Sequence, residues 1–255
     1  MPPWRWTIGP FGVKDLFTVI NLLGGVVGVI FVINGHPRLA GLAVFAGYLF
    51  GYALDGTVAR LTGTSNKFGS EFDTATDHFA QAIAPAVIVF GVYAQQGHAT
   101  AGAVLMGIII VFGTIRQALF SVARLGDPLI YCGLPRTVSG YACMSMVLSQ
   151  TFVSGGETAL IAGGVVIAAL AIMGILPIPY MTHRGARRMQ GYVKVLVFGF
   201  LLGPPVLLIF APAYTFDLIC VFLLGYSAFA WFPLSSAERA SFRARYRDWA
   251  VEVSR

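Results

Sequence analysis

The segment Tyr52–Asp77, YALDGTVARLTGTSNKFGSEFDTATD, brings three aspartates and an arginine into a very apolar sequence. Ionisable side chains at the ends of hydrophobic helices are costly, so by default they indicate a functional site. We therefore expect the remainder of the chain to be the scaffold that holds this segment. The charged residues in question are Asp55, Arg60, Asp73 and Asp77.

The composition indicates a membrane protein. Of 255 residues, 57% are hydrophobic and 11% are charged, whereas about 25% of the residues in soluble domains are charged. The three cysteines are too scattered for a disulfide framework or a metal-binding spacing, so we expect them to be small core residues. Residues 1–15 combine Trp4, Trp6 and basic residues without the pattern of a signal peptide, and they predict an interfacial segment.

Eight apolar segments are long enough to span a membrane, which takes about 20 residues. Polar residues, glycines and prolines separate them. We predict an all-α integral membrane fold of about eight transmembrane helices, which form a single helical domain over 16–235 with its motif at 52–77. The segments are 16–34, 39–59, 74–95, 101–121, 138–154, 158–180, 192–212 and 215–233.

Basic residues predict the orientation, because Lys and Arg accumulate in cytoplasmic loops. Of the 17 Lys and Arg residues, all except Arg38 and Arg116 lie near the N-terminus, in alternate loops or near the C-terminus. Both termini and the loop at 60–69 are thus expected on the cytoplasmic side of the cell membrane. This distribution attributes the net charge of +6 to topology and anionic lipid, and not to nucleic-acid binding.

Two basic features have more than one interpretation. The cytoplasmic basic tail, 236–255, fits either an amphipathic helix on the inner leaflet or a solvated segment. Arg116, inside the fourth apolar segment, could line the same cavity as the aspartates, or it could bond to Asp127 or to a carbonyl oxygen.

Helical spacing groups the aspartates on facing helices, because residues three or four apart are neighbours on a helix. Asp55 shares a face with Tyr52 and Ala59. Asp73 and Asp77 share a face at the start of the third segment. The short polar turn makes the two helices antiparallel, so Asp55 can face the other two aspartates. Clustered oxygen ligands suit Mg²⁺ or Mn²⁺, and such an ion removes the repulsion among the carboxylates.

Small residues and an arginine accompany these aspartates. Gly56, Ala59 and Gly69 permit close approach of helix backbones or of a bulky ligand. Arg60 can pair with a phosphate. Taken one at a time, these residues fit a structural ion pair and the glycines common in membrane helices equally well.

The spacing is that of a known signature, D-x-x-D-G-x-x-A-R followed by G-x-x-x-D-x-x-x-D. Here Asp55-Gly56, Ala59-Arg60, Gly69, Asp73 and Asp77 match it. The chain thereby resembles the CDP-alcohol phosphotransferase family. KDLFTVINLLGG at 14–25 and SVARLGDPLIYCGLP at 121–135 are similar to the phosphatidylserine/archaetidylserine synthase branch. The resemblance extends over most of residues 14–150 and is weak beyond them.

The resemblance implies a phosphatidyl transfer in phospholipid biosynthesis. A CDP-linked lipid would bind through its diphosphate to a divalent metal, Mg²⁺ or Mn²⁺, and an alcohol, L-serine in this branch, would displace CMP. The implied metal ligands are Asp55, Asp73 and Asp77, with Asp77 also the catalytic base. The implied CDP-lipid site consists of Gly56, Ala59, Arg60, Gly69, Thr18 and Asn21, and the acceptor-binding candidates are Arg124, Arg136 and Thr137. A homodimer is common in this family.

The sequence departs from the signature at its first position, where Tyr52 replaces an aspartate. A neutral phenol is a poor ligand for a hard metal ion. Asp15, the only acid before Asp55, is too far along the chain to substitute on that face. Two functions are therefore open: an active transferase, or an impaired relative that binds CDP-lipid or a partner without turnover. The acceptor could also be glycerol phosphate or inositol phosphate, which would be expected to need more basic residues.

Overall fold

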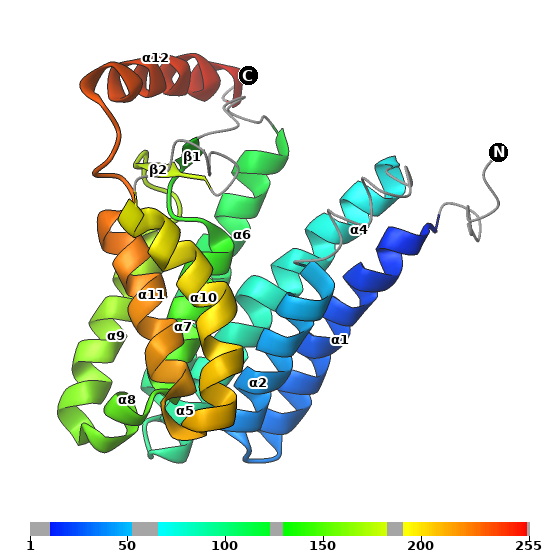
Figure 1. Cartoon of the computed structure of the whole chain (residues 1–255), viewed down its shortest axis with the longest axis vertical. Helices are drawn as coiled ribbons and strands as arrows, with labels where there is room; N and C mark the ends of the chain where they lie inside the picture. The colour runs from blue at the N-terminus through cyan, green and yellow to red at the C-terminus, as the bar shows by residue number, and fades with distance from the viewer. Residues whose placement is uncertain (1–10, 53–65, 123–129, 183–190, 254–255) are drawn as a thin grey trace. The chain divides into compact units, whose positions relative to one another are not determined.

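The computed structural model describes residues 11–52, 66–122, 130–182 and 191–253 (Figure 1). Two compact units make up the chain, Met1–Ala103 and Val104–Arg255, each with its own internal contacts. Helices dominate both, and within the described ranges the only strands are one pair of three residues each. The all-α membrane fold predicted from the sequence is therefore confirmed.

In its described part, the first unit consists mainly of three helical segments that lie side by side. Its elements are α1 (Val13–Ile33), α2 (Pro37–Gly47), η1 (Tyr48–Tyr52), α4 (Lys67–His78), η2 (Phe79–Ile83) and α5 (Ala84–Gln95). The last three form one continuous rod of 29 residues, called here the α4–α5 rod. Figure 1 shows α1 in dark blue beside both α2 and this rod.

Glycines bring α1 and α2 into close contact. A β-carbon on Gly24 would lie 2.6 Å from the Cα of Gly47, so only glycine fits there. Gly35, with a φ of +83°, makes the turn between the helices, a conformation that residues with a side chain rarely adopt. Small residues at the interface are a common means of packing helices in a membrane, where no hydrophobic force acts between helices.

α1 and the α4–α5 rod run in the same direction. Their contacting pairs, in order along both helices, are Asp15 with Gly69, Asn21 with Asp77, and Val32 with Gly91. The contacts are polar near the start of both helices and apolar near their ends. This register decides which side chains of α1 meet the signature aspartates.

The rod begins earlier than the sequence predicts, at Lys67 and not at 74. Asn66 is its N-cap, because its side-chain oxygen accepts a hydrogen bond from the backbone N–H of Gly69 at 2.7 Å. Asp73 and Asp77 consequently lie well inside a helix and not at its start. The helical spacing of the two aspartates is thereby fixed.

A proline explains the π-helical turn η2 in the middle of the rod. Pro85 has no N–H to donate to the carbonyl of Gln81 four residues earlier, and its ring would clash with that carbonyl. The helix widens here, and the N–H of Ala84 bonds to the carbonyl of Phe79, five residues back. Such widened turns occur often at functional sites.

The second unit joins helices to one short strand pair. Its elements are most of α6 (Ala99–Val122), then β1 (Ile130–Cys132), α7 (Arg136–Leu148), α8 (Gln150–Ser154), α9 (Gly156–Met173), β2 (Pro179–Met181), α10 (Gly191–Phe210), η4 (Pro212–Tyr214), α11 (Thr215–Phe229) and α12 (Ser236–Val253). The strands are antiparallel, with Tyr131 opposite Tyr180. Arg116 of α6 donates to the carbonyl oxygens of Cys132 at 2.9 Å and Gly174 at 2.5 Å. The sequence left more than one role open for Arg116, and the structure shows the one in which it bonds to carbonyl oxygens.

The basic tail contains a helix with a packed apolar face. In α12, Phe242 and Trp249 are buried, and Phe242 belongs to a cluster with Ile130, Cys132 and Leu234. Tyr246 packs between the two rings, with centroids 6.2 Å from Phe242 and 5.5 Å from Trp249. The helix (red in Figure 1) thus contacts the β1 region of its own unit through this face.

Each of the eight predicted spans corresponds to helix in the described parts of the chain. Six of these helices are long and apolar enough to cross a membrane. The other two are shorter as described: an apolar helix at Pro37–Gly51, and α7 followed by α8. The three cysteines are free and buried, as predicted.

Candidate active site

Asp77 is the centre of the polar contacts in the first unit. It is 8% exposed, and its Oδ1 accepts two hydrogen bonds, from Asn21 Nδ2 at 3.2 Å and from Gln81 Nε2 at 2.8 Å. Both donors are themselves buried. A carboxylate accepts such bonds when ionised, and the bonds help offset the cost of placing it in apolar surroundings.

A buried polar stripe on α1 supplies one side of the site. Its residues Lys14, Asp15, Thr18 and Asn21 recur at nearly helical spacing, and all four are buried. Because α1 and α4 run in register, Thr18 lies at the level of Asp73, between the contacts that Asp15 and Asn21 make. Polar residues are seldom buried without a partner, so a stripe of this kind indicates contact with polar groups.

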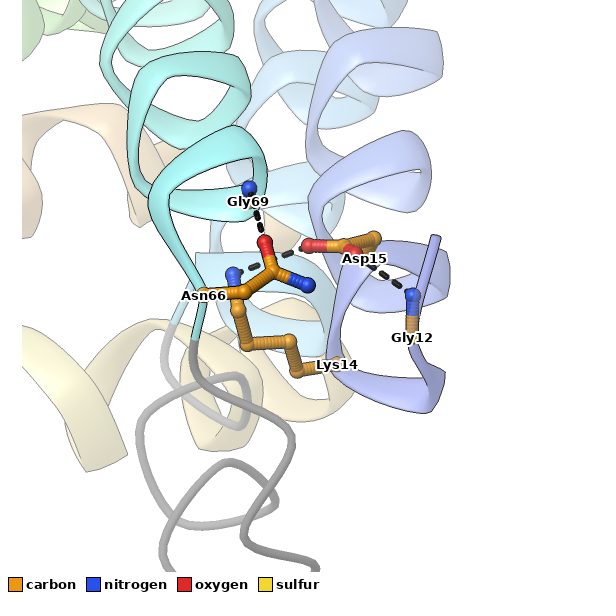
Figure 2. Close-up of polar contacts among 5 residues, drawn as sticks. All are labelled: Gly12, Lys14, Asp15, Asn66 and Gly69. Atoms are coloured by element: carbon orange, nitrogen blue, oxygen red, sulfur yellow. Dashed lines mark hydrogen bonds and ion pairs between the residues drawn. The ribbon is translucent and has the colours of Figure 1, made fainter. Parts of the chain in front are cut away.

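A buried ion pair lies at the N-terminal end of this stripe, as Figure 2 shows. Lys14 Nζ lies 2.8 Å from Asp15 Oδ1, and Asp15 Oδ2 accepts from the N–H of Gly12 at 2.7 Å. A β-carbon on Gly69 would lie 2.6 Å from Asp15 Oδ1. The signature glycine Gly69 is therefore the point where α4 meets the charged pair of α1.

Several buried oxygens in this region make no hydrogen bond within the described part of the chain. They are Thr18 Oγ1, Asn21 Oδ1 and Thr76 Oγ1. An unsatisfied buried oxygen is rare in a folded protein and needs an explanation, such as a bound ion, water or ligand. Thr76 lies on α4 with Asp73 and Asp77, and Thr18 and Asn21 lie on α1, which packs against α4.

The donor set fits a divalent metal of the hard type. Asp73 and Asp77 share one face of α4, and with Thr18 and Asn21 they supply only oxygen atoms, the ligands that Mg²⁺ and Mn²⁺ prefer. Among the described residues, no group of three or more His, Cys, Asp or Glu is gathered closely enough to hold a metal ion. The third predicted ligand, Asp55, lies outside the described residues.

Other predicted residues also lie outside the described ranges: Gly56, Ala59, Arg60 and Arg124. The chain on either side of 53–65 is described. Before it, a β-carbon on Gly51 would lie 2.8 Å from the Cβ of Asn21, and after it Asn66 caps α4 near Asp15. The described residues on both sides of 53–65 therefore adjoin the polar part of α1.

The acceptor candidates Arg136 and Thr137 belong to the second unit. They begin α7, and an Nη of Arg136 donates to the side-chain oxygen of Gln117 on α6. This contact joins the start of α7 to α6.

Sequence reasoning missed two contributors to the site. The first is Gln81, and the sequence does carry a signal for it. It is a lone amide in an apolar stretch, and at four residues after Asp77 it is a neighbour of that aspartate on a helix. The sequence predicts that Asp15 is too distant along the chain to replace the missing ligand, and its place beside Gly69 follows only from the packing of α1 on α4.

The described helices thus place the signature aspartates Asp73 and Asp77 in a membrane-type scaffold. The sequence model of the CDP-alcohol phosphatidyltransferase family matches residues 12–223, and the chain belongs to this family. The match extends well beyond residue 150, where the resemblance read from the sequence became weak.

Several relatives share one name, CDP-diacylglycerol--serine O-phosphatidyltransferase. The protein from Helicobacter pylori strain J99 is 26% identical over 187 residues, which is 72% of this chain and 76% of that protein. The Methanocaldococcus jannaschii protein is 27% identical over 123 residues, 48% of this chain and 54% of that one. The Saccharomyces cerevisiae protein is 30% identical over 115 residues, 42% of this chain and 40% of that one.

Family membership establishes the general chemistry. The chain is a multi-pass membrane protein of the phosphatidyltransferase class, whose substrates are a CDP-linked lipid and an alcohol and whose members generally use a divalent metal.

Proposed function

We propose that this chain transfers the phosphatidyl group of a CDP-linked lipid to L-serine. The serine hydroxyl oxygen forms a bond to the lipid-side phosphorus, the bond from that phosphorus to CMP breaks, and Asp77 takes the hydroxyl proton. The observation that supports this most directly is the buried Asp77, held at one oxygen by Asn21 and Gln81. The names of the relatives support serine as the acceptor.

Asp55, Asp73 and Asp77 would hold the metal ion, Mg²⁺ or Mn²⁺. When bound, the ion neutralises the diphosphate and orients it for in-line displacement. The protein itself contributes a base held by two hydrogen bonds and the buried oxygens Thr18 Oγ1 and Asn21 Oδ1.

The remaining residues have roles in binding. Gly69, with Gly56, Ala59 and Arg60, would shape the space for the CDP moiety beside Thr18 and Asn21, and Arg124, Arg136 and Thr137 would bind the serine carboxylate. In this proposal the site faces the cytoplasm from the cell membrane, where CDP-activated lipid is available, and the protein forms a homodimer.

A specific residue favours a second function. Tyr52 stands where the signature has its first aspartate, so the metal site has one carboxylate fewer. The alternative is a family relative that binds CDP-lipid or a partner and does not turn it over.

A CMP-release assay separates the two functions. Purified protein is incubated with CDP-lipid, labelled serine and a range of Mn²⁺ and Mg²⁺ concentrations, with glycerol phosphate and inositol phosphate as competing acceptors. Transfer to serine that is lost in Asp77→Asn would support the proposal. The control is Glu157→Gln, which makes the same change from carboxylate to amide at an exposed residue and should keep the activity. Absence of CMP release at every metal concentration, with CDP-lipid still bound, would establish the non-catalytic alternative.

A further inference from the structure

Gln81 is an amide in surroundings that should disfavour it. It is 2% exposed and lies in the π-helical turn η2, with the apolar residues Ala80 and Ala82 on either side. Burying an amide is costly unless it is hydrogen-bonded. Its Nε2 donates a hydrogen bond to Asp77 Oδ1 at 2.8 Å. This is the shorter of the two hydrogen bonds that side-chain amides donate to that oxygen.

The two amides reach Asp77 from different elements. Gln81 belongs to the same rod as Asp77, whereas Asn21 belongs to α1. A carboxylate held by one donor can still turn about its side-chain bonds, but donors from two helices fix both its direction and its distance from α1. Functional groups need to be held within about 0.5 Å of the productive geometry, and such support usually comes from a surrounding layer of hydrogen bonds.

We infer that Gln81 is a positioning residue that, together with Asn21, fixes the orientation of the Asp77 carboxylate for its part in the reaction. This inference rests on the proposed function, because it assigns Asp77 the part of base and ligand. It also bears on Tyr52: a site with three carboxylates depends more strongly on the orientation of each one.

The test replaces the amide by an apolar side chain of similar length. Gln81→Met and Gln81→Leu both remove the donor. The control is Ser145→Ala, which also removes a buried polar group, but from the second unit. In transfer assays with saturating metal, we expect each Gln81 variant to lose about tenfold or more in kcat, while KM for the CDP-lipid stays within about threefold.

A second readout does not need turnover. Free Mn²⁺ is measured by electron paramagnetic resonance in the presence of CDP, and the Gln81 variants are expected to bind Mn²⁺ about tenfold more weakly than the wild type. If the wild type binds Mn²⁺ and CDP but transfers to no alcohol, the proposed function fails, and this comparison still tests the part played by Gln81.

Two results would overturn the inference. One is Mn²⁺ binding and kcat within about twofold of the wild type in a folded Gln81 variant. The other is a melting temperature far below that of Ser145→Ala in both variants, because the amide would then support the fold and not the site.

Discussion

The backbone of Gly69 lies directly against the carboxylate of Asp15: a β-carbon there would lie 2.6 Å from Asp15 Oδ1 and would also collide with Lys14 Nζ (Figure 2). The signature glycine is thus a packing requirement set by an ion pair on another helix. This gives it a role that can be tested without substrate.

Gly69→Ala should push α4 away from α1. We expect a loss of about 1–3 kcal/mol in stability, typical of overpacking, together with a fall in any transfer activity. The matched control is Gly107→Ala in α6, where an added β-carbon would have no neighbour within 4 Å and should be neutral or slightly stabilising. Thermal unfolding in detergent measures both; equal melting temperatures for the two variants would contradict the packing argument.

Asp15 and Lys14 should be coupled in stability. Asp15→Asn leaves a buried ammonium without its counter-charge, which typically costs about 3 kcal/mol or more. In the double variant with Lys14→Met the charge is gone as well, so part of that loss should be recovered. A double-mutant cycle gives the coupling energy between the two residues. A value near zero would mean that the ion pair, with its 2.8 Å between Lys14 Nζ and Asp15 Oδ1, contributes nothing to the stability of the fold.

Pro85→Ala tests what widens the helix near the site. Alanine restores the missing N–H donor, so η2 can tighten into α-helix, in which Asp77 and Gln81 remain neighbours four residues apart. We therefore expect stability to be kept or raised and kcat to stay within about twofold of the wild type. Pro37→Ala is the control, because Pro37 occupies the first position of α2, where the N–H has no partner in the helix. A fall in kcat of about tenfold in Pro85→Ala alone would show that the widened turn itself is needed for catalysis.

Tyr52→Asp should restore the full signature. We expect the Mn²⁺ concentration for half-maximal activity to drop by about tenfold, since a fourth carboxylate joins the metal site. The measurement is a metal titration of CMP release in both proteins. If the titrations coincide in active protein, three carboxylates are sufficient and Tyr52 costs the enzyme nothing.

Phe242 of α12 should protect Cys132. Burial raises the pKa of the Cys132 thiol to about 11, although the nearby Arg116 lowers it, so little thiolate is present at pH 8. Phe242→Ala removes a buried ring from the same cluster, and we expect a loss of about 3 kcal/mol and faster alkylation of Cys132. Peptide mass spectrometry distinguishes Cys132 from Cys143 and Cys220. The exposed Val251→Ala serves as the control, and equal alkylation rates would show that α12 does not cover the thiol.

The sequence predicts much of this molecule because its signals are local. Hydrophobic length predicts the helices, and the spacing of Asp73 and Asp77 predicts their shared face. The family resemblance predicts that Asn21 lies near the site, and in the structure Asn21 donates a hydrogen bond to Asp77. In each case, a pattern within one helix or one motif was enough.

What the sequence could not predict depends on contacts between helices. Nothing along the chain tells that Asp15 meets Gly69, because this follows from the register of α1 on α4. The pairing of Tyr131 with Tyr180 joins strands of three residues that are too short for any periodicity to appear. The early start of α4 is an intermediate case, since the cap at Asn66 is visible in the sequence once a helix is assumed there.

The widened turn at Phe79–Ile83 has a consequence for how this site can change over generations. A π-helical turn amounts to one extra residue in an otherwise regular helix. Deleting the codon of Gln81 would return the helix to regular geometry and leave α5 facing its neighbours as before, yet it would remove the amide that bonds to Asp77. The membrane scaffold and the support of the catalytic aspartate can therefore be inherited separately, by a single insertion or deletion.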